Sequence, residues 1–271
     1  MGCDIGYEGP LVFVMGSTGV GKSNFASRLS DFFPLEVINV DSTSVYKGLN
    51  IGSGKPNKKI LTATPHHLLS FCDLSDTYSA ARFRFDAIKA ISEIRAKGKV
   101  PVLVGGTGMY FRMLERGMAP LPGANAEIRR NLQSLLKRNG VEHLHSILSK
   151  LDPLSAERIN PNDPQRIIRA IEVCRVSGTK MSVLLQVSQE PLSMPPVKLV
   201  LTLRERAKIH ERVSLRFLLM LEQGLINEVS ELRRSYKMFR DYSALDSVGY
   251  KQVGEFLDGQ ISYQEMIEKA I

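Results

Sequence analysis

Gly16-Ser17-Thr18-Gly19-Val20-Gly21-Lys22-Ser23 is the stretch that decides the fold. It follows the apolar run of residues 11–15, which predicts a buried strand, and it opens into residues 24–29, which have helical spacing. The stretch fits G-x-x-x-x-G-K-[ST], in which backbone N–H groups converge on phosphate oxygens, the lysine reaches the outer phosphate and the hydroxyl ligates Mg²⁺. We therefore predict that all eight residues bind a phosphorylated ligand, with Ser23 as the metal ligand. A plain glycine turn is the alternative; ATP is the commonest ligand of such loops, but the motif does not identify it.

Asp41 directly follows the next apolar run, residues 36–40. Since ligands of open α/β sheets bind beyond the carboxyl ends of the strands, we expect Asp41 in the same crevice as Lys22. Its carboxylate is a candidate general base, and a helix cap or a contact to a magnesium-bound water is the alternative. Residues 45–56 are rich in glycine and contain lysine, which indicates a loop over this site.

A helix is predicted over residues 79–97, with Ser79 as N-cap and Gly98 as the end, and it leads into a strand at residues 100–104. The repeated strand–helix–strand order predicts a parallel sheet with right-handed crossovers. The strand ends in Gly105-Gly106-Thr107-Gly108, which allows a ligand to approach the backbone and supplies a hydroxyl at the start of a helix. An ordinary N-cap threonine is the alternative.

Strand-like runs disappear between Leu121-Pro122 and Pro195-Pro196, and amphipathic segments take their place at residues 125–138, 141–150 and 164–176. We predict a P-loop NTPase-like α/β core from residues 1–120 and 196–271, with an all-helical insertion at residues 121–195. In the insertion, Asp163 and Pro164 predict a helix start, and Arg166 and Arg169 share one face. The isoleucines Ile167, Ile168 and Ile171 turn toward the core, and a solvated basic face is the alternative for the arginines.

Residues 197–203 predict the last strand, followed by a long helix to Glu222 that Gly224 ends. Arg212 and Arg216 lie four residues apart on this helix, so their guanidinium groups share a face, an arrangement that a diphosphate would stabilise. The adjacent His66 and His67 cannot share one face of a strand, and no further ligands lie nearby. We therefore predict hydrogen bonds within the fold for both, and metal ligation is the alternative.

The composition is that of a globular protein, with 271 residues, 43% hydrophobic and 24% charged. Three distant cysteines argue against a disulfide framework and for a reducing cytoplasm. No apolar run is long enough for a membrane span and no signal sequence is visible, so we expect no membrane contact. The formal charge of +8 and the pI of about 9.4 favour a polyanionic partner such as nucleic acid, and no obligate protein partner is evident.

Taken together, these residues resemble the tRNA dimethylallyltransferase (IPP transferase) family over almost the whole chain. The resemblance rests on the order of residues 16–23, Val40-Asp41-Ser42, residues 45–52, Pro65-His66-His67-Leu68, Val104-Gly105-Gly106-Thr107, Asn162-Asp163-Pro164-Gln165-Arg166 and Gly249-Tyr250-Lys251-Gln252. It implies transfer of a dimethylallyl group from dimethylallyl diphosphate to N6 of the adenosine 3′ of the anticodon, with Mg²⁺ as cofactor and the tRNA anticodon stem-loop as partner.

The resemblance also implies roles for single residues. Asp41 resembles the general base, Thr107 the hydroxyl that positions the reacting atoms, and Lys22, Ser23 with Mg²⁺, and Arg216 the groups that neutralise the diphosphate. Three segments resemble the family's tRNA contacts: Asp41, Ser42, Thr43 and Ser44; Gln165, Arg166, Ile167, Ile168 and Arg169; and Ser247, Val248, Gly249, Tyr250, Lys251 and Gln252. An unstacked, flipped acceptor base is expected.

Several departures from the family pattern bear on these roles. Ser17 replaces a usual proline, and Phe217 and Leu218 replace a valine and an acidic residue after the arginine. Family members continue beyond residue 271 into an arginine-rich helix, so we expect part of the tRNA surface to be missing. Prenyl transfer to free adenine nucleotides, a P-loop small-molecule kinase and an RNA-binding module without catalysis remain as alternatives. The last leaves Lys22 and Asp41 without a purpose, and no lid arginines or adenine ligand identify a kinase.

Overall fold

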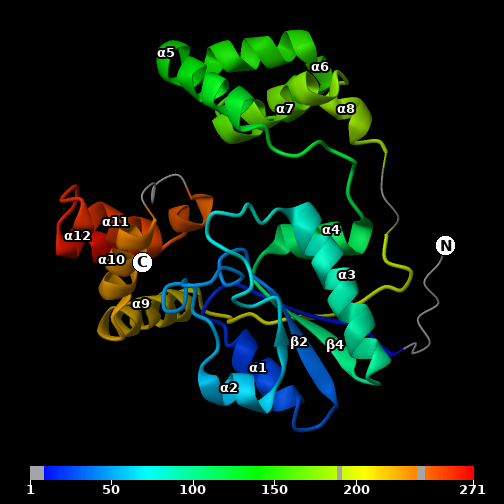
Figure 1. Cartoon of the computed structure of the whole chain (residues 1–271), viewed down its shortest axis with the longest axis vertical. Helices are drawn as coiled ribbons and strands as arrows, with labels where there is room; N and C mark the ends of the chain where they lie inside the picture. Colours follow the sequence, from blue (N-terminus) through cyan, green and yellow to red (C-terminus); the bar gives the residue numbers. More distant parts are fainter. Residues whose placement is uncertain (1–8, 188–190, 237–241) are drawn as a thin grey trace. The chain divides into compact units, whose positions relative to one another are not determined.

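The chain folds into two compact units. The structure, a computed structural model, describes residues 9–187, 191–236 and 242–271. The sheet unit combines the chain up to Glu115 with the chain from Met194 onward, and the helical unit is Arg116–Ser193. Figure 1 shows the helical unit in green at the top of the view. The boundaries expected from the sequence, at residues 121 and 195, lie within a few residues of this division.

The sheet of the sheet unit has five parallel strands among the described residues, in the order β3-β2-β4-β1-β5. They are β1 (Val12–Met15), β2 (Leu35–Val40), β3 (His66–His67), β4 (Val100–Gly105) and β5 (Val197–Val200). The predicted parallel α/β fold is confirmed. β5 is shorter than the expected residues 197–203, although the Leu201 N–H still donates to the Met15 carbonyl at 2.8 Å.

Helices flank this sheet and continue beyond its last strand. They are α1 (Lys22–Leu29), α2 (Lys58–Ala63), α3 (Ala80–Ala96), α4 (Gly108–Arg116), α9 (Arg206–Glu222), α10 (Leu225–Ser235), the 3₁₀ helix η2 (Ser243–Asp246), α11 (Tyr250–Leu257) and α12 (Tyr263–Ala270). The Ser79 side chain accepts from the Arg82 N–H at 3.2 Å, which confirms the predicted N-cap of α3. Among all helices of the described chain, none has the length and apolar character needed to cross a membrane.

The two-residue alternation along the strands determines which helix packs on which face of the sheet. Val14 and Val104 are buried in one cluster with Ala26 of α1. Their neighbour Phe13 points the opposite way, and its ring lies 4.9 Å from that of Phe111 in α4. Each buried apolar side chain of this size contributes roughly 1.5–3 kcal/mol. This packing fixes the carboxyl ends of β1, β2 and β4 beside the start of α1.

The helical unit contains α5 (Ala126–Leu151), α6 (Pro153–Arg158), α7 (Pro164–Ser177) and α8 (Met181–Leu184). The three amphipathic segments expected from the sequence are confirmed, whereas α6 and α8 were not expected. Gly140, with φ 79° and ψ 173°, interrupts the helical path of α5 between the two segments predicted there. Asp163 Oδ1 accepts from the Arg166 N–H at 3.0 Å and Pro164 is the first helical residue, as predicted.

Candidate active site

The loop of residues 16–23 is folded around the amino group of Lys22. Lys22 Nζ donates to the carbonyl oxygens of Gly16, at 2.9 Å, and Ser17, at 2.7 Å. Gly16 has φ 148°, and a Cβ atom there would overlap the Leu201 carbonyl, so a side chain is excluded. Gly21 caps α1 without any side-chain hydrogen bond. The first N–H groups of α1 therefore have neither a helical partner nor a side-chain cap, which suits an anion.

One pocket joins this loop to five other segments of the sheet unit. Its lining includes Thr18, Lys22, Ser23, Asn39, Asp41, Ser44, Ser53, Gly54, Lys55, His66, Gly105, Gly106 and Arg216. The structure therefore brings Lys22, Asp41 and Arg216 together, although they lie far apart in the sequence. The pocket lies beyond the carboxyl ends of β1, β2 and β4, where α/β sheets bind their ligands.

Asp41 has one oxygen fixed by its own turn. Asp41 Oδ1 accepts from the Thr43 N–H at 2.8 Å, the Thr43 hydroxyl at 2.6 Å and the Ser44 N–H at 3.1 Å. Within the described part of the chain, no hydrogen bond to Oδ2 is found. The carboxylate is thus both a local cap and a lining group, and its second oxygen is able to accept a proton.

Three cations share the pocket with this single carboxylate. Burial lowers the pKa of Lys22, and the nearby Arg216 charge lowers it further, while Asp41 opposes the shift. Burial lowers the pKa of Lys55 to about 8, against the attraction of Glu228 and Asp41. Burial also lowers the pKa of Arg216, which the Asp41 charge opposes. The charged forms are incompletely solvated, so a bound anion would stabilise them.

Arg216 reaches the pocket from α9, and its guanidinium lies directly against the backbone of Gly54. A Cβ atom on Gly54 would overlap the Arg216 guanidinium, and Gly54 also has φ 60°. A side chain at this position would push the arginine away. The absence of a side chain at Gly54 therefore leaves the space that the Arg216 guanidinium occupies.

Thr107 lies beside the pocket and is not part of the lining. The lining ends at Gly106, and the Thr107 side chain is half-buried. Its N–H donates to the Val40 carbonyl at 3.4 Å, and its carbonyl accepts from the Tyr110 N–H at 3.0 Å. The structure thus fixes the backbone of Thr107 at the end of β2, next to Asp41.

The segment of residues 247–252, predicted to contact tRNA, contains both exposed and buried residues. Val248 and Lys251 are exposed. Tyr250 is fully buried, and its hydroxyl donates to Glu228 Oε1 at 2.6 Å and accepts from the Ser53 N–H at 3.2 Å. Gln252 is also buried and accepts from the N–H of Gly249 at 2.8 Å, while the Ser247 hydroxyl donates to a backbone carbonyl. Tyr250 and Gln252 hold the fold together in this structure.

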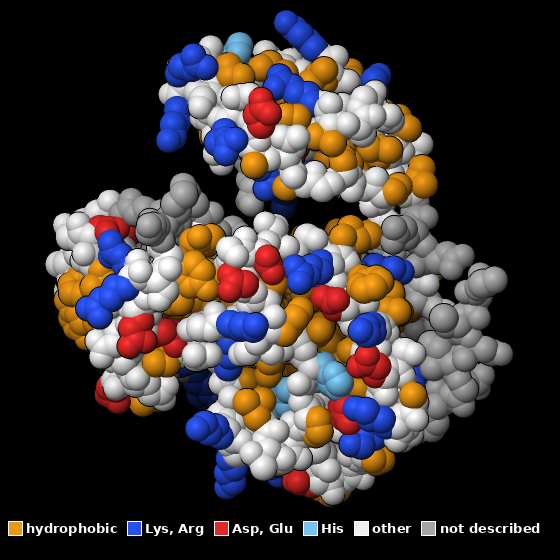
Figure 2. Space-filling view, in the orientation of Figure 1, with side chains coloured by type: hydrophobic (Ala, Val, Ile, Leu, Met, Phe, Trp, Pro, Cys, Tyr) orange, Lys and Arg blue, Asp and Glu red, His pale blue; other side chains and the backbone are white. Residues whose placement is uncertain are grey.

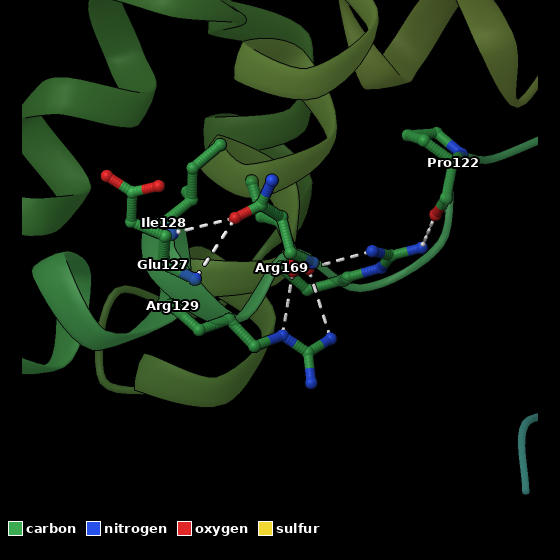
Figure 3. Close-up of polar contacts among 7 residues, drawn as sticks. Pro122, Glu127, Ile128, Arg129 and Arg169 are labelled. Carbon is green, nitrogen blue, oxygen red and sulfur yellow. Dashed lines mark hydrogen bonds and ion pairs between the residues drawn. The ribbon is translucent and has the colours of Figure 1, made fainter. Parts of the chain in front are cut away.

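The segment of residues 165–169 on α7, also predicted to contact tRNA, likewise contains both exposed and buried residues. Gln165 and Arg166 are exposed, whereas Ile167 is fully buried and Ile168 is half-buried against the same core, as predicted. Arg169 donates from Nη1 to Glu172 Oε2 at 2.7 Å and from Nη2 to the Pro122 carbonyl at 2.7 Å. Figure 3 shows the contact of Arg169 with Pro122. Arg166 is therefore available to a ligand, and Arg169 serves as a link within the unit.

The two histidines make the hydrogen bonds predicted for them. His66 Nδ1 lies 2.7 Å from the Thr64 carbonyl, and His67 Nε2 lies 2.7 Å from Glu36 Oε2. In the described ranges, no cluster of three or more His, Cys, Asp or Glu side chains has the arrangement of a metal site.

The loop lysine Lys55 was not predicted as a site residue. The only sequence signal for it was its place in a glycine-rich loop expected over the site.

The comparisons with known proteins agree with this geometry. The family model described as IPP transferase matches residues 44–271. The chain is 44% identical over 264 residues to a tRNA dimethylallyltransferase of Nitrosomonas europaea, which covers 97% of this chain and 83% of that protein.

Two solved structures are similar in fold. The full-length tRNA isopentenylpyrophosphate transferase of Bacillus halodurans has a TM-score of 0.64 at 33% identity, covering 96% of this chain and 81% of that one. A eukaryotic dimethylallyltransferase, described as acting on tRNA, has a TM-score of 0.76 at 27% identity, covering 97% of this chain and 66% of that one.

Proposed function

The chain belongs to the IPP transferase family, and we propose that it transfers a dimethylallyl group from dimethylallyl diphosphate to N6 of the adenosine just 3′ of the anticodon in tRNA. The observation that carries this proposal is the single pocket lined by Lys22, Asp41 and Arg216. It combines the two groups that the reaction needs, which are cations for a departing diphosphate and a carboxylate for a departing proton.

The reaction forms a bond between the adenosine N6 and C1 of the dimethylallyl group, and it breaks the bond between C1 and the diphosphate oxygen. The diphosphate leaves with the electron pair of the broken bond. Lys22 and Arg216 lie where they would stabilise its growing negative charge. Fixed donors of this kind contribute roughly 3 kcal/mol each to a transition state.

Asp41 takes the proton that N6 loses. Its Oδ1 is held by Thr43 and Ser44, which orients the carboxylate while Oδ2 is available to the substrate. Thr107, beside the pocket, would donate its hydroxyl to the reacting atoms once both substrates are in place. A base positioned in this manner contributes roughly 10²–10⁴-fold to the rate.

Mg²⁺ fits the oxygen donors of this pocket, since the hydroxyl of Ser23 and the carboxylate of Asp41 line it. Ser23 would hold the ion. When bound, Mg²⁺ supplies further charge neutralisation to the leaving group. Lys22 and the N–H groups at the start of α1 bind the diphosphate on the side of the loop.

The tRNA contacts belong to the exposed members of the three segments. In the sheet unit these are Ser42, Val248 and Lys251. In the helical unit they are Gln165 and Arg166. Figure 2 shows Lys and Arg side chains spread over the helical unit, at the top of the view, with few acidic side chains among them. A basic surface suits the phosphates of an anticodon stem-loop.

The cytoplasm is the compartment that we propose for this activity. Cys72 and Cys174 are both buried free thiols. Burial raises the pKa of each thiol, which favours the unreactive protonated form. Free thiols are typical of a reducing compartment, where tRNA is also present.

A label-transfer assay tests the proposed function. The protein is incubated with Mg²⁺ and labelled dimethylallyl diphosphate, and separately with unmodified tRNA carrying adenosine after the anticodon, with AMP, or with ATP plus candidate acceptors. Label in tRNA alone is the expected result. Label in AMP alone would identify an adenine-nucleotide prenyltransferase, phosphate transfer from ATP would identify a kinase, and both would overturn the proposal.

A further inference from the structure

We propose that Lys55 is a further diphosphate-binding residue, and that Glu228 and Tyr250 are positioning residues that hold the loop carrying it. The loop, residues 50–56, is called the strap below. This inference rests on the proposed function, because it assigns residues to the diphosphate that the reaction releases. It concerns the sheet unit alone.

The strap lines the same pocket as residues 16–23, which are called the phosphate loop below. Ser53, Gly54 and Lys55 line the pocket together with Lys22 and Asp41. Its own backbone is tightly turned, with the Gly54 N–H donating to the Ile51 carbonyl at 2.9 Å. The strap therefore places one cation in the pocket directly and seats a second one, Arg216, against Gly54.

Lys55 is held at its amino group and not left to move freely. Lys55 Nζ donates to the Tyr46 carbonyl at 2.7 Å and to Asn50 Oδ1 at 3.3 Å. An ammonium group has three N–H donors, so one remains for a ligand. Both partners are neutral, and the half-buried cation therefore keeps its charge unpaired by any direct ion pair among the described residues.

The charge balance of the pocket identifies the ligand as a multiply charged anion. Lys22, Lys55 and Arg216 face one carboxylate, Asp41, so the lining carries two surplus positive charges. Lys22 stands on the phosphate loop and Lys55 on the strap, while Arg216 comes from α9 and lies against Gly54. Three cations from three separate segments match the two phosphoryl groups of a diphosphate better than a single phosphate.

Glu228 and Tyr250 fasten the strap from α10 and α11. The Glu228 carboxylate accepts from three successive N–H groups of the strap, those of Asn50 at 3.1 Å, Ile51 at 2.8 Å and Gly52 at 3.3 Å. The same carboxylate accepts from the Tyr250 hydroxyl. That hydroxyl in turn accepts from the Ser53 N–H at 3.2 Å. Four consecutive N–H groups before Gly54 and Lys55 are thus fixed by two side chains.

The first test measures the binding of inorganic pyrophosphate to the full chain by calorimetry, without tRNA. Lys55→Met keeps the length of the side chain and removes its charge, and it should weaken pyrophosphate binding by about ten- to hundredfold. Lys55→Arg should restore most of the loss. Lys58→Met, which removes an exposed lysine of α2 outside the pocket, should leave the affinity unchanged. Binding by Lys55→Met within about twofold of the wild type would overturn the proposal.

The second test separates a positioning role from an RNA contact. Tyr250→Phe removes only the hydroxyl, and it should raise the KM for dimethylallyl diphosphate by about three- to tenfold while the Kd for tRNA stays constant. Glu228→Gln should act in the same direction, and melting followed by circular dichroism checks that each variant is folded. If Glu228→Gln does not fold, Tyr250→Phe alone decides. A weakened tRNA affinity with unchanged pyrophosphate binding would overturn the positioning role.

The outcomes distinguish this inference from the proposed function. A wild-type protein that binds pyrophosphate and does not prenylate tRNA would contradict the proposed function alone. A wild-type protein that prenylates tRNA, with a Lys55→Met variant that binds pyrophosphate normally, would contradict the inference alone.

Discussion

The pocket of the sheet unit and the Glu172 cluster of the helical unit both gather cations around one carboxylate, with opposite results. In the pocket, three cations accompany Asp41, and none of the ion pairs seen in the described residues joins them to it. Lys22 and Lys55 instead donate to neutral carbonyl and amide oxygens. These two lysines are held in place by neutral groups, and both line the pocket.

The Glu172 carboxylate, by contrast, accepts hydrogen bonds directly from the two arginines beside it. Glu172 is fully buried and accepts from Arg129 Nε at 2.8 Å and Nη2 at 3.0 Å, from Arg169 Nη1 at 2.7 Å and from the Asn125 N–H at 2.7 Å. Figure 3 shows this network at the start of α5. Burial would raise the pKa of Glu172, but the hydrogen bonds from Arg129 and Arg169 hold it below its usual value.

The difference separates a ligand site from an architectural contact. A buried carboxylate whose oxygens are saturated by arginines fixes helices to each other and has no remaining capacity for a ligand. A cavity with surplus cations remains electrostatically incomplete until an anion enters. Both sites contain arginine, so residue type alone does not distinguish them; the ratio of charges and the presence of a cavity do.

Asp41→Asn should have the largest effect on the pocket. The amide keeps an oxygen that accepts from Thr43 and Ser44, but it does not take up the N6 proton. We expect kcat to fall by about 10²–10⁴-fold, with tRNA affinity unchanged. Steady-state kinetics and a filter-binding titration with tRNA measure the two quantities.

Asp73→Asn is a matched control for this variant. Asp73 Oδ1 accepts from the N–H and the hydroxyl of Ser75 at 2.9 and 2.6 Å, which is the same local turn as that of Asp41 and Thr43. Asp73 is exposed and lies outside the pocket, so turnover should stay at the wild-type level. Equal losses in both variants would assign Asp41 to the turn and remove it from the base role.

Glu172→Gln should act on stability and leave the pocket unaffected. The substitution removes the buried charge and leaves Arg129 and Arg169 without their ion pair, so we expect a loss of about 3 kcal/mol in the free energy of unfolding. Urea denaturation measures it, and pyrophosphate binding should not change. Glu142→Gln, which replaces an exposed glutamate of α5, should change the stability by less than about 0.5 kcal/mol. Weaker pyrophosphate binding in Glu172→Gln would break the distinction between the two sites.

Glu36 extends the comparison, because it is a saturated carboxylate inside the sheet unit. It is buried and accepts from His67 Nε2 at 2.7 Å, Lys99 Nζ at 2.9 Å and Lys97 Nζ at 3.0 Å. Burial raises the pKa of Glu36, but these three hydrogen bonds prevail and lower it to about 2. A depressed folded-state pKa gives stability that is present above the unfolded pKa and is lost as the pH falls toward the folded one.

We therefore expect the wild type to lose about 2 kcal/mol through Glu36 between pH 5 and pH 3. Glu36→Gln should lack this part of the pH dependence, whereas Glu93→Gln, at an exposed position of α3, should retain it. Unfolding free energies of the three proteins at both pH values provide the measurement. An identical acid loss in Glu36→Gln and the wild type would contradict the assignment.

The sequence predicted those features that depend on local spacing. The strand–loop–helix order around residues 16–23, the parallel strands and the Asp163 cap of α7 all follow from residues within one turn or strand of each other. The roles of Lys55 and Tyr250 depend instead on Glu228, which lies on another element and shows no local pattern. From the sequence, Tyr250 was therefore predicted only as an RNA contact, because the family resemblance implies it. Its burial is known only from the structure.

Arg169 had a sequence signal that local spacing could have revealed. Glu172 follows it by three residues on α7, which places the two side chains on one face. What the spacing does not give is that Glu172 is fully buried, because that depends on Asn125 and Arg129 packing from α5. Three residues of separation therefore indicate a pair, while the tertiary contacts decide whether the pair is structural.

Arg166 and Arg169 offer the smallest test, within one helix. The Arg166 side chain is 75% exposed, and its Nε lies 3.4 Å from Asp163 Oδ2. Arg169 is bound more closely, at 2.7 Å to both Glu172 and the Pro122 carbonyl. Arg166→Ala should weaken tRNA binding by about fivefold and reduce the slope of log Kd against log salt by about 1, with no loss of stability. Arg169→Ala should instead lower the urea midpoint and leave the salt slope unchanged in the folded protein. An unaltered slope in Arg166→Ala would make it a solvated surface arginine, and a reduced slope in Arg169→Ala would show that a saturated contact still serves the RNA.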